Sequence, residues 1–375
     1  MPRFLHTADW QMGRQYGRFA ADDAAALSEA RFKVVERLAQ LATDKKVDAI
    51  LVAGDVFDAQ NLADRTIRRT FNALAAFAGP WILIPGNHDA ALAESIWMQA
   101  ARLHAIPENA HVLLEPGVTE FAELGFAILA APLTQRQTHD DLTAWFDTAQ
   151  TPGGLLRIGL AHGSIEGQLP EAADSSNPIA ADRAESARLD YLALGDWHGT
   201  KCIDARTWYS GTPEQERFKD NDAGQALIVE IDHPKAEPKV TRCPVGQHRW
   251  IKLHQHLAVA SDLEQALQEL DALPAQSVVD VTVDGQLDLA SFEHLQQALG
   301  AAGGRQRSLV PHLDALRIEP TEDDLASLQA DGYVGDVIAD LRERQQADGE
   351  QAETARDALV ILAGMLRNRR AGVAK

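Results

Sequence analysis

Several short apolar runs in this chain end in side chains that bind metal ions or move protons. In the clearest case, the run Trp81–Ile84 is followed by a Pro-Gly break and then by Asn87, His88 and Asp89. This pattern is typical of a buried parallel strand and its carboxyl end. Loops at that edge of an open α/β sheet bind ligands. We therefore predict a site in which Asn87 offers a neutral oxygen, His88 offers a proton and Asp89 orients His88.

Four other apolar runs end in the same way. Apolar residues at helical spacing over 22–42 and 63–78 predict a helix after each of the first two runs. Alternating strands and helices predict an α/β fold, and so many strands ending in Asp, Asn or His are hard to attribute to folding needs alone. The run Phe4–His6 leads to Asp9 and Gln11, Asp48–Ala53 to Asp55 and Asp58, Leu155–Ala161 to His162, and Tyr191–Leu194 to Asp196 and His198.

These side chains have the chemistry of a metal centre. Oxygen and imidazole ligands without thiolate suit Mn²⁺, Fe²⁺ or Zn²⁺, and Asp55 is the natural bridge between two ions. Each residue also has an ordinary interpretation. Asp9 and Asp55 can form turns, and His162 can be a buried structural histidine. The other motifs favour the metal site for Asp9 and Asp55. His162 taken alone stays open at this point, and Asp58 suits either a role beside the substrate or the cap of a turn.

The rest of the chain predicts further strands and further domains. Two later strands, near 208–213 and 226–231, complete a two-sheet α/β sandwich, and the long polar connection 164–188 is predicted to be a lid or a substrate-facing loop. Clustered Pro, Lys and Gly over 234–247 mark a boundary. We predict a catalytic domain over 1–245, a small α/β domain over 246–319 and a helical segment over 320–375.

Charge and cysteine usage narrow the class of protein. Fifty-five Asp and Glu residues against 35 Lys and Arg give a net charge of −20, which argues against broad electrostatic binding of nucleic acid. Any binding of nucleic acid must therefore be local, assisted by a metal ion or supplied by a partner. The two cysteines form no CxxC pair, so they indicate neither a disulfide framework nor a zinc knuckle. From the composition of the chain we expect neither a signal peptide nor a membrane span, and we expect a cytoplasmic protein.

The combined motifs resemble the calcineurin-like metallophosphoesterase superfamily. In chain order they are Asp-x-(His) at Asp9, with Gln11 in the place of the histidine, then Gly-Asp-x-x-Asp at Gly54, Gly-Asn-His-Asp at Gly86, His-Gly at His162 and Gly-x-x-His at Gly195. Within this superfamily, the chain is similar to bacterial Mre11/SbcD-like DNA repair nucleases. The similarity lies in the segments 5–9, 191–195 and 209–214 and in the small domain that follows them. The resemblance implies a two-sheet α/β sandwich with helices outside, then a small α/β capping domain and C-terminal helices.

The resemblance also implies a mechanism. It assigns Asp9, Gln11, Asp55 and His198 to a first metal ion, and Asp55, Asn87, His162 and Asp196 to a second. A metal-bridging hydroxide would attack the phosphorus of a DNA phosphodiester, His88 would protonate or steady the leaving oxygen, and Asp89 would orient His88. Arg14 and Asp58 are candidates for contacts with the substrate.

Two residues depart from the family pattern. Gln11 stands where the family usually has histidine, and Asp196 stands where it usually has the first histidine of Gly-His-x-His. An amide oxygen is a weaker ligand than an imidazole, and Asp196 adds a negative charge. We therefore expect Mn²⁺ as the ion, with Mg²⁺ or Fe²⁺ as alternatives, and lower occupancy on the side of Gln11.

The resemblance further implies a homodimer and a Rad50/SbcC-like coiled-coil ATPase as a partner. The helix predicted over 355–369 is the candidate docking element, and the alternative is a helix folded back on its own domain. Two other functions stay open at this stage. One is a metallophosphoesterase for small phosphodiesters, nucleotides or phosphoproteins. The other is a non-catalytic scaffold protein whose metal site is altered at Gln11 and Asp196.

Overall fold

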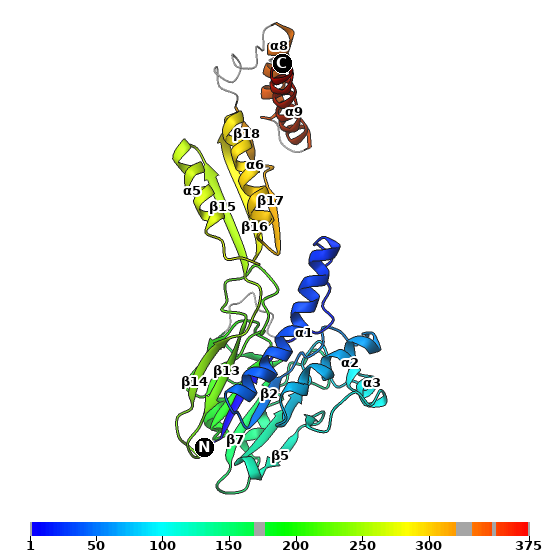
Figure 1. The fold of residues 1–375 in the computed structure, drawn as a ribbon. Coiled ribbons are helices and arrows are strands. Elements are labelled where there is room, and N and C mark those ends of the chain that lie inside the picture. Colours follow the sequence, from blue (N-terminus) through cyan, green and yellow to red (C-terminus); the bar gives the residue numbers. More distant parts are fainter. Residues whose placement is uncertain (1, 169–176, 320–331, 347–349, 374–375) are drawn as a thin grey trace. The chain divides into compact units, whose positions relative to one another are not determined.

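The computed structural model describes residues 2–168, 177–319, 332–346 and 350–373, with side chains as far as Leu362. The chain divides into two units, Met1–His248 and Arg249–Lys375. Figure 1 shows the course of the chain and labels several of its helices and strands. Among the described residues, no helix is long and apolar enough to cross a membrane.

The first sheet contains the strands that carry the first three motifs. Four of its strands run parallel, and the last two strands return antiparallel to complete one edge. Across the sheet the order is β14 (Lys239–Pro244), β13 (Gln225–Glu230), β1 (Arg3–Thr7), β2 (Ala49–Ala53), β3 (Trp81–Ile84) and β4 (Ala110–Val112).

The second sheet carries the two remaining motifs. Its four central strands are parallel to one another and its two edge strands are antiparallel to their neighbours. Across the sheet the order is β11 (Lys201–Cys202), β12 (Thr207–Tyr209), β10 (Tyr191–Gly195), β7 (Leu156–His162), β6 (Phe126–Ala131) and β5 (Gly117–Phe121).

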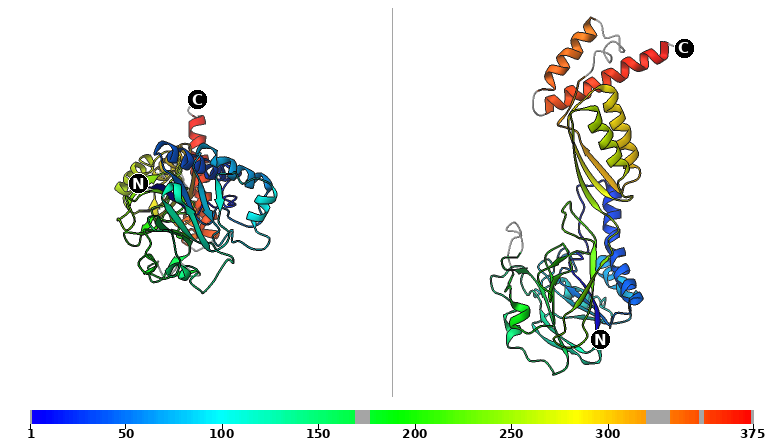
Figure 2. Two further views of the ribbon diagram at one scale, coloured as in Figure 1. Left: turned by 90° about the horizontal axis from the view of Figure 1, so that it is seen from below. Right: turned by 90° about the vertical axis from the view of Figure 1, so that its left-hand side faces the viewer.

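Alternating side chains of the first sheet build two cores. Phe4, Leu51 and Ile82 point toward the second sheet, while their neighbours Leu5 and Ile50 pack against helices. Because successive side chains of a strand face opposite ways, both faces of such a sheet must be covered. The covering helices are α1 (Ala21–Asp44), α2 (Asp64–Asn72) and α3 (Ile96–Arg102), and the view from below in Figure 2 shows the first two on one side of the strands.

This architecture confirms the predicted two-sheet α/β sandwich with helices outside. The second predicted helix is shorter than its apolar stripe suggests, because α2 ends at Asn72 and a 3₁₀ turn, Ala73–Ala76, continues it. The connection after β7 contains the short paired strands β8 (Ser164–Ile165) and β9 (Pro178–Ile179), followed by the short helix α4 (Arg183–Ser186). Residues 169–176, the middle of the predicted lid, lie outside the described part of the chain.

The second unit begins with a small parallel sheet. The helices α5 (Ala260–Asp271) and α6 (Leu289–Gly303) contribute to a separate apolar core. The last two strands of this sheet are close together in the sequence and are separated by a short turn. The four strands are β15 (Trp250–Leu257), β16 (Val278–Leu287), β17 (Ser308–His312) and β18 (Leu316–Ile318), and β16 pairs with the other three.

The C-terminal helices are α8 (Tyr333–Arg344) and α9 (Glu350–Val373). The first part of α9 packs on its own unit, since Leu359 is buried and Arg356 donates to the carbonyl oxygens of Asp314 and Leu316 at 2.6 and 3.0 Å. This part of α9 therefore follows the alternative of a helix folded back on its own domain. Residues 320–331 of the predicted docking segment, and the α9 side chains after Leu362, lie outside the described part of the chain.

Candidate metal centre

The loops that follow β1 and β2 run side by side. The backbone N–H of Asp9 donates to the carbonyl of Gly54 at 3.1 Å, and that of Gln11 donates to the carbonyl of Asp55 at 2.9 Å. Met12 N–H continues the series to Val56 at 2.8 Å. Parallel pairing thus extends beyond the strands, and the backbone itself brings the first two predicted ligands together.

Several predicted ligands have a strained backbone. The φ angles of Asp9, Gln11, Asp55 and Asp196 are 55°, 46°, 53° and 97°, a region that side chains other than glycine rarely occupy. Backbone strain of this kind costs about 1–3 kcal/mol per residue and is found mostly at functional sites. The preceding Gly54 is also constrained, since a Cβ there would collide with the His162 ring.

The side chains of Asp9, Asp55 and His162 meet at the centre of the site, with ligand atoms within 4.8 Å of one another. From His162 Nε2, the distances are 3.2 Å to Asn87 Oδ1, 3.6 Å to Asp55 Oδ1 and 3.8 Å to Asp196 Oδ1. A divalent ion with bonds of about 2.1 Å holds adjacent ligands about 3 Å apart. These residues therefore fit an ion after small movements, and we call Asn87, His162 and Asp196 the Asn87–His162 half of the centre.

A main-chain oxygen orients His162. Its Nδ1 lies 2.8 Å from the carbonyl of Ala53, which accepts the ring proton and leaves Nε2 facing the carboxylates. Burial disfavours a charged ring, but Asp55, Asp9 and Asp196 outweigh burial and raise the pKa of His162 to about 9. Burial raises the pKa of Asp9 to about 6. A buried group of carboxylates that retains a proton in this way is a favourable place for a cation.

Gln11 and His198 form the other half of the centre, the Gln11–His198 half. His198 Nδ1 donates to Glu216 Oε1 at 2.6 Å, so Nε2 again faces inward. Glu216 Oε2 accepts from the buried Arg31 at 2.7 Å. Although burial favours the neutral acid, His198, Arg31 and Arg14 hold the pKa of Glu216 well below its ordinary value. A charged side-chain network thus orients His198, where a backbone carbonyl orients His162.

The amide of Gln11 points its nitrogen at the site. Gln11 Nε2 lies 3.3 Å from His198 Nε2, while Gln11 Oε1 accepts from Arg14 Nη1 at 2.6 Å. An amide nitrogen has no free lone pair for a metal ion, so Gln11 offers a ligand only if its oxygen turns inward. The Gln11–His198 half therefore fits an ion less well than the other half.

His88 lies at the edge of the cluster, and its surroundings correct one prediction. The His88 ring contacts the carbonyl of Asp58, 2.8 Å from Nδ1, whereas the Asp89 carboxylate accepts from the backbone N–H groups of Gly86 at 2.7 Å and Phe57 at 3.1 Å. Asp89 thus holds the loop, and the backbone of Asp58 orients the ring. Burial raises the pKa of Asp89 to about 7.

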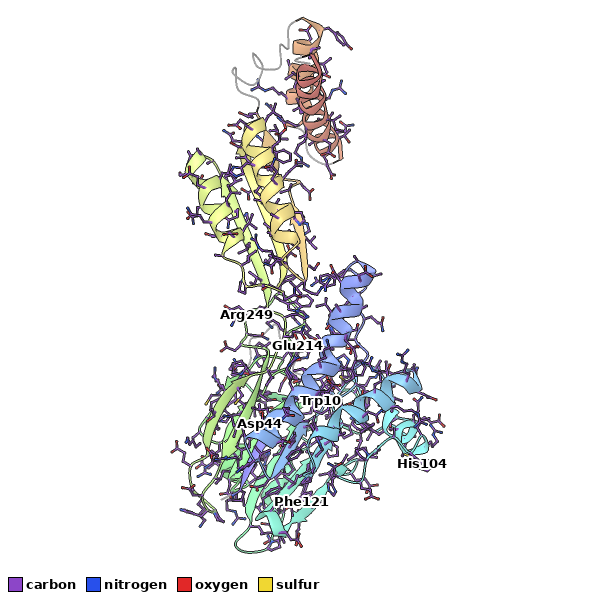
Figure 3. The ribbon with its side chains drawn as sticks, in the orientation of Figure 1. Trp10, Asp44, His104, Phe121, Glu214 and Arg249 are labelled. Atoms are coloured by element: carbon purple, nitrogen blue, oxygen red, sulfur yellow. The ribbon has the colours of Figure 1, made fainter. Side chains whose placement is uncertain are left out.

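The structure brings all the predicted site residues into one region and adds two that the sequence did not reveal. Glu216 lies just beyond the 209–214 segment, and its buried contacts with His198 and Arg31 distinguish it from a surface acid. Arg31 sits within the apolar face of α1, where a charged residue among buried neighbours is itself a signal of a buried partner. Figure 3 labels Trp10, whose carbonyl oxygen also accepts a hydrogen bond from Arg31, and Glu214, a second buried carboxylate near Glu216.

Comparison with known proteins identifies the class of this molecule. The calcineurin-like phosphoesterase family model matches residues 2–199, more than half of the chain, so the chain belongs to that family. It is accordingly a metal-dependent hydrolase of the metallophosphoesterase fold.

Individual relatives show which members of the family this chain resembles. Over 338 residues the chain is 28% identical to the SbcD component of the nuclease SbcCD from Bacillus subtilis, covering 79% of this chain and 83% of that protein. It is 38% identical over 261 residues to the SbcD component from Rhodobacter capsulatus, covering 56% and 62% of the two chains. It is 25% identical over 339 residues to the DNA double-strand break repair protein Mre11 of Methanosarcina acetivorans, covering 85% of this chain and 51% of that one.

Proposed function

We propose that this protein hydrolyses phosphodiester bonds in DNA with two divalent ions, Mn²⁺ above Mg²⁺ or Fe²⁺. The observation that carries the proposal is the buried cluster of Asp9, Asp55 and His162 at the carboxyl ends of two sheets. Family membership supports it, as do the relatives named as a nuclease subunit and as a DNA double-strand break repair protein. The predicted ligands are Asp9, Gln11, Asp55 and His198 for the first ion and Asp55, Asn87, His162 and Asp196 for the second.

The bound ions would activate water and neutralise charge on the phosphate. The protein's own part is to position groups around that phosphate. His88 is about 40% exposed, so its ring reaches the solvent side of the cluster, where it can protonate or steady the leaving oxygen. Hydrogen bonds from its backbone N–H to Asp55 and from its ring to the Asp58 carbonyl fix its direction. These contacts suit proton transfer to a substrate atom outside the metal cluster.

Positive and aromatic side chains beside the centre support a polymeric substrate. Cations interleaved with aromatic rings are the means by which proteins hold nucleic-acid backbones and bases. In this chain, whose net charge is −20, such side chains would provide a local binding surface for DNA. Lysine and arginine groups lie against rings in these pairs: Lys219 with Trp197 at 4.4 Å, Lys201 with Trp197 at 5.9 Å, and Arg18 with Phe218 at 5.0 Å.

The test compares wild type and His88→Ala with Mn²⁺ on linear DNA and on a chromogenic phosphodiester. We expect wild type to cleave DNA, and the variant to lose DNA cleavage by about 100-fold or more while its metal content is unchanged. Full DNA cleavage by His88→Ala would exclude the assigned role. A wild type that cleaves the chromogenic diester but leaves DNA intact would favour the small-substrate alternative.

The same proposal extends to partners. We propose a homodimer and a Rad50/SbcC-like coiled-coil ATPase, supported by the relatives that are named as one component of SbcCD. The candidate docking segment is the C-terminal one that contains α8 and α9, apart from the first part of α9, which packs on its own unit. Copurification of the full chain with such an ATPase, and the mass of the complex in solution, test this extension.

A further inference from the structure

We propose that Arg14 is a built-in competitor for the metal ion of the Gln11–His198 half. Its guanidinium holds the Gln11 oxygen and thereby turns the Gln11 amide nitrogen toward His198, so the ion of the Asn87–His162 half binds earlier. The later binding event, in the Gln11–His198 half, then requires Arg14 to release Gln11. This inference rests on the proposed two-ion site. It implies that the two positions bind their ions with different affinities.

The first step of the argument is the direction of the Gln11 amide. Arg14 Nη1 lies 2.6 Å from Gln11 Oε1, a distance typical of a strong charge-assisted hydrogen bond. Turning the amide over would place Gln11 Nε2 against the Arg14 N–H groups, where two donors face each other. Arg14 therefore fixes the amide in the orientation that presents nitrogen, and not oxygen, to His198.

The second step is the state of His198. Two groups approach His198 Nδ1: Glu216 Oε1 at 2.6 Å and Arg217 Nη2 at 2.9 Å. The shorter contact is to a carboxylate that can only accept, so we place the ring proton on Nδ1 and the lone pair on Nε2. That lone pair is the one a metal ion would use, and Gln11 Nε2 donates to it at 3.3 Å. Within this half of the centre, an internal hydrogen bond thus occupies the histidine atom that would bind the ion.

The third step is the place of Arg14 itself. Besides Gln11, its guanidinium contacts Glu216 Oε2 at 3.1 Å and Asp58 Oδ1 at 3.3 Å. It therefore brings a permanent positive charge beside His198, where a divalent cation would otherwise be the counter-charge for Glu216. The Arg14 side chain is 27% exposed, so it can swing toward solvent without opening the core.

In the Asn87–His162 half, no described arginine or lysine holds a ligand oxygen in the way that Arg14 holds Gln11. The Ala53 carbonyl holds His162, and oxygens of Asn87, Asp55 and Asp196 surround its Nε2. The contrast predicts ordered loading, with one tight and one weak ion in the wild-type protein.

The experiment is a calorimetric titration of chelator-treated full-length protein with Mn²⁺ at constant pH, without any DNA. We expect two events of different affinity in wild type. Arg14→Ala should tighten the weaker event by about 10- to 100-fold, the net value of a charge-assisted hydrogen bond, and leave the tighter event unchanged. Gln11→His should also raise the affinity of the weaker event, because Arg14 does not hold an imidazole nitrogen away from the ion as it holds the Gln11 oxygen.

Arg217→Ala is the matched control. Arg217 contacts Glu216 and lies 2.9 Å from His198 Nδ1, but makes no described contact with Gln11. An equal gain in Arg217→Ala would show a simple charge effect and would overturn the proposal. Two equally tight ions in wild type, or an unchanged or weakened second event in Arg14→Ala, would also overturn it. Failure to cleave DNA would count against the proposed function and leave this titration unaffected.

Discussion

The two halves of the metal centre carry similar ligands on different supports. In the Asn87–His162 half, the histidine is anchored to a main-chain carbonyl between two sheets, and oxygens face its free nitrogen. In the Gln11–His198 half, the histidine is anchored to a buried carboxylate that itself needs Arg31. A backbone anchor is built by the fold, whereas a side-chain anchor can be lost or altered by one substitution. The comparison indicates that the side-chain anchor of His198 is the place where substitutions can change the metal affinity of the centre.

The most damaging change we expect is His162→Ala. The ring lies among the ligand atoms of Asp9, Asp55, Asn87 and Asp196, so its loss should disturb the position of both ions. Mn²⁺ binding should fall by more than the roughly 10- to 100-fold that loss of an outer partner costs. Metal analysis after dialysis measures this loss. Two ions retained per chain would show that the halves do not depend on a common centre.

The next effect should come from Glu216→Gln. Without the carboxylate, His198 loses its charged anchor and Arg31 loses its buried partner. We expect about 10- to 100-fold weaker Mn²⁺ binding, confined to the weaker event. Glu214→Gln is the matched control, because Glu214 is equally buried and pairs with Arg37 of the same helix but makes no described contact with His198. Equal losses in the two variants would show that the effect is general damage to the fold.

A smaller and graded effect should come from pH. In the metal-free protein the carboxylates raise the pKa of His162 from 6.5 to about 9, so the folded state binds this proton more tightly than the unfolded state. The resulting stability is complete below pH 6.5 and is lost as pH rises through about 9. An ion must displace the same proton, so Mn²⁺ affinity should rise about tenfold per pH unit across this window.

Thermal unfolding in a chelating buffer and Mn²⁺ titrations over the same pH series measure both slopes. The unfolding temperature of the metal-free protein should fall toward high pH while Mn²⁺ affinity rises. Slopes of the same sign would contradict the assignment of the proton to the ligand nitrogen of His162.

Much of the catalytic fold was predictable because its strands appear in the sequence as apolar runs that are followed by polar residues. The two sheets, the helices on the outer face and the clustering of Asp9, Asp55, Asn87 and His162 follow from that pattern and from the family resemblance. The short elements α3, β4 and β14 were not predicted, because few residues carry their periodicity.

The details of hydrogen bonding were less predictable. The sequence places Asp89 next to His88, yet a side chain and its neighbour leave a tight loop in different directions, and Asp89 caps backbone N–H groups instead. Gln11 is visible as a departure from the family, but the direction of its amide depends on Arg14, Asp58 and Glu216 meeting in space. Glu216 and Arg31 are 185 positions apart in the chain, and only folding makes them a pair.

The pairing of the loops after β1 and β2 has a consequence for the life of the protein in a cell. Main-chain hydrogen bonds between these two loops hold Asp9, Gln11 and Asp55 in their strained positions. The protein should therefore survive demetallation and reload without refolding. Its activity would then depend on the concentration of the free divalent ion around it.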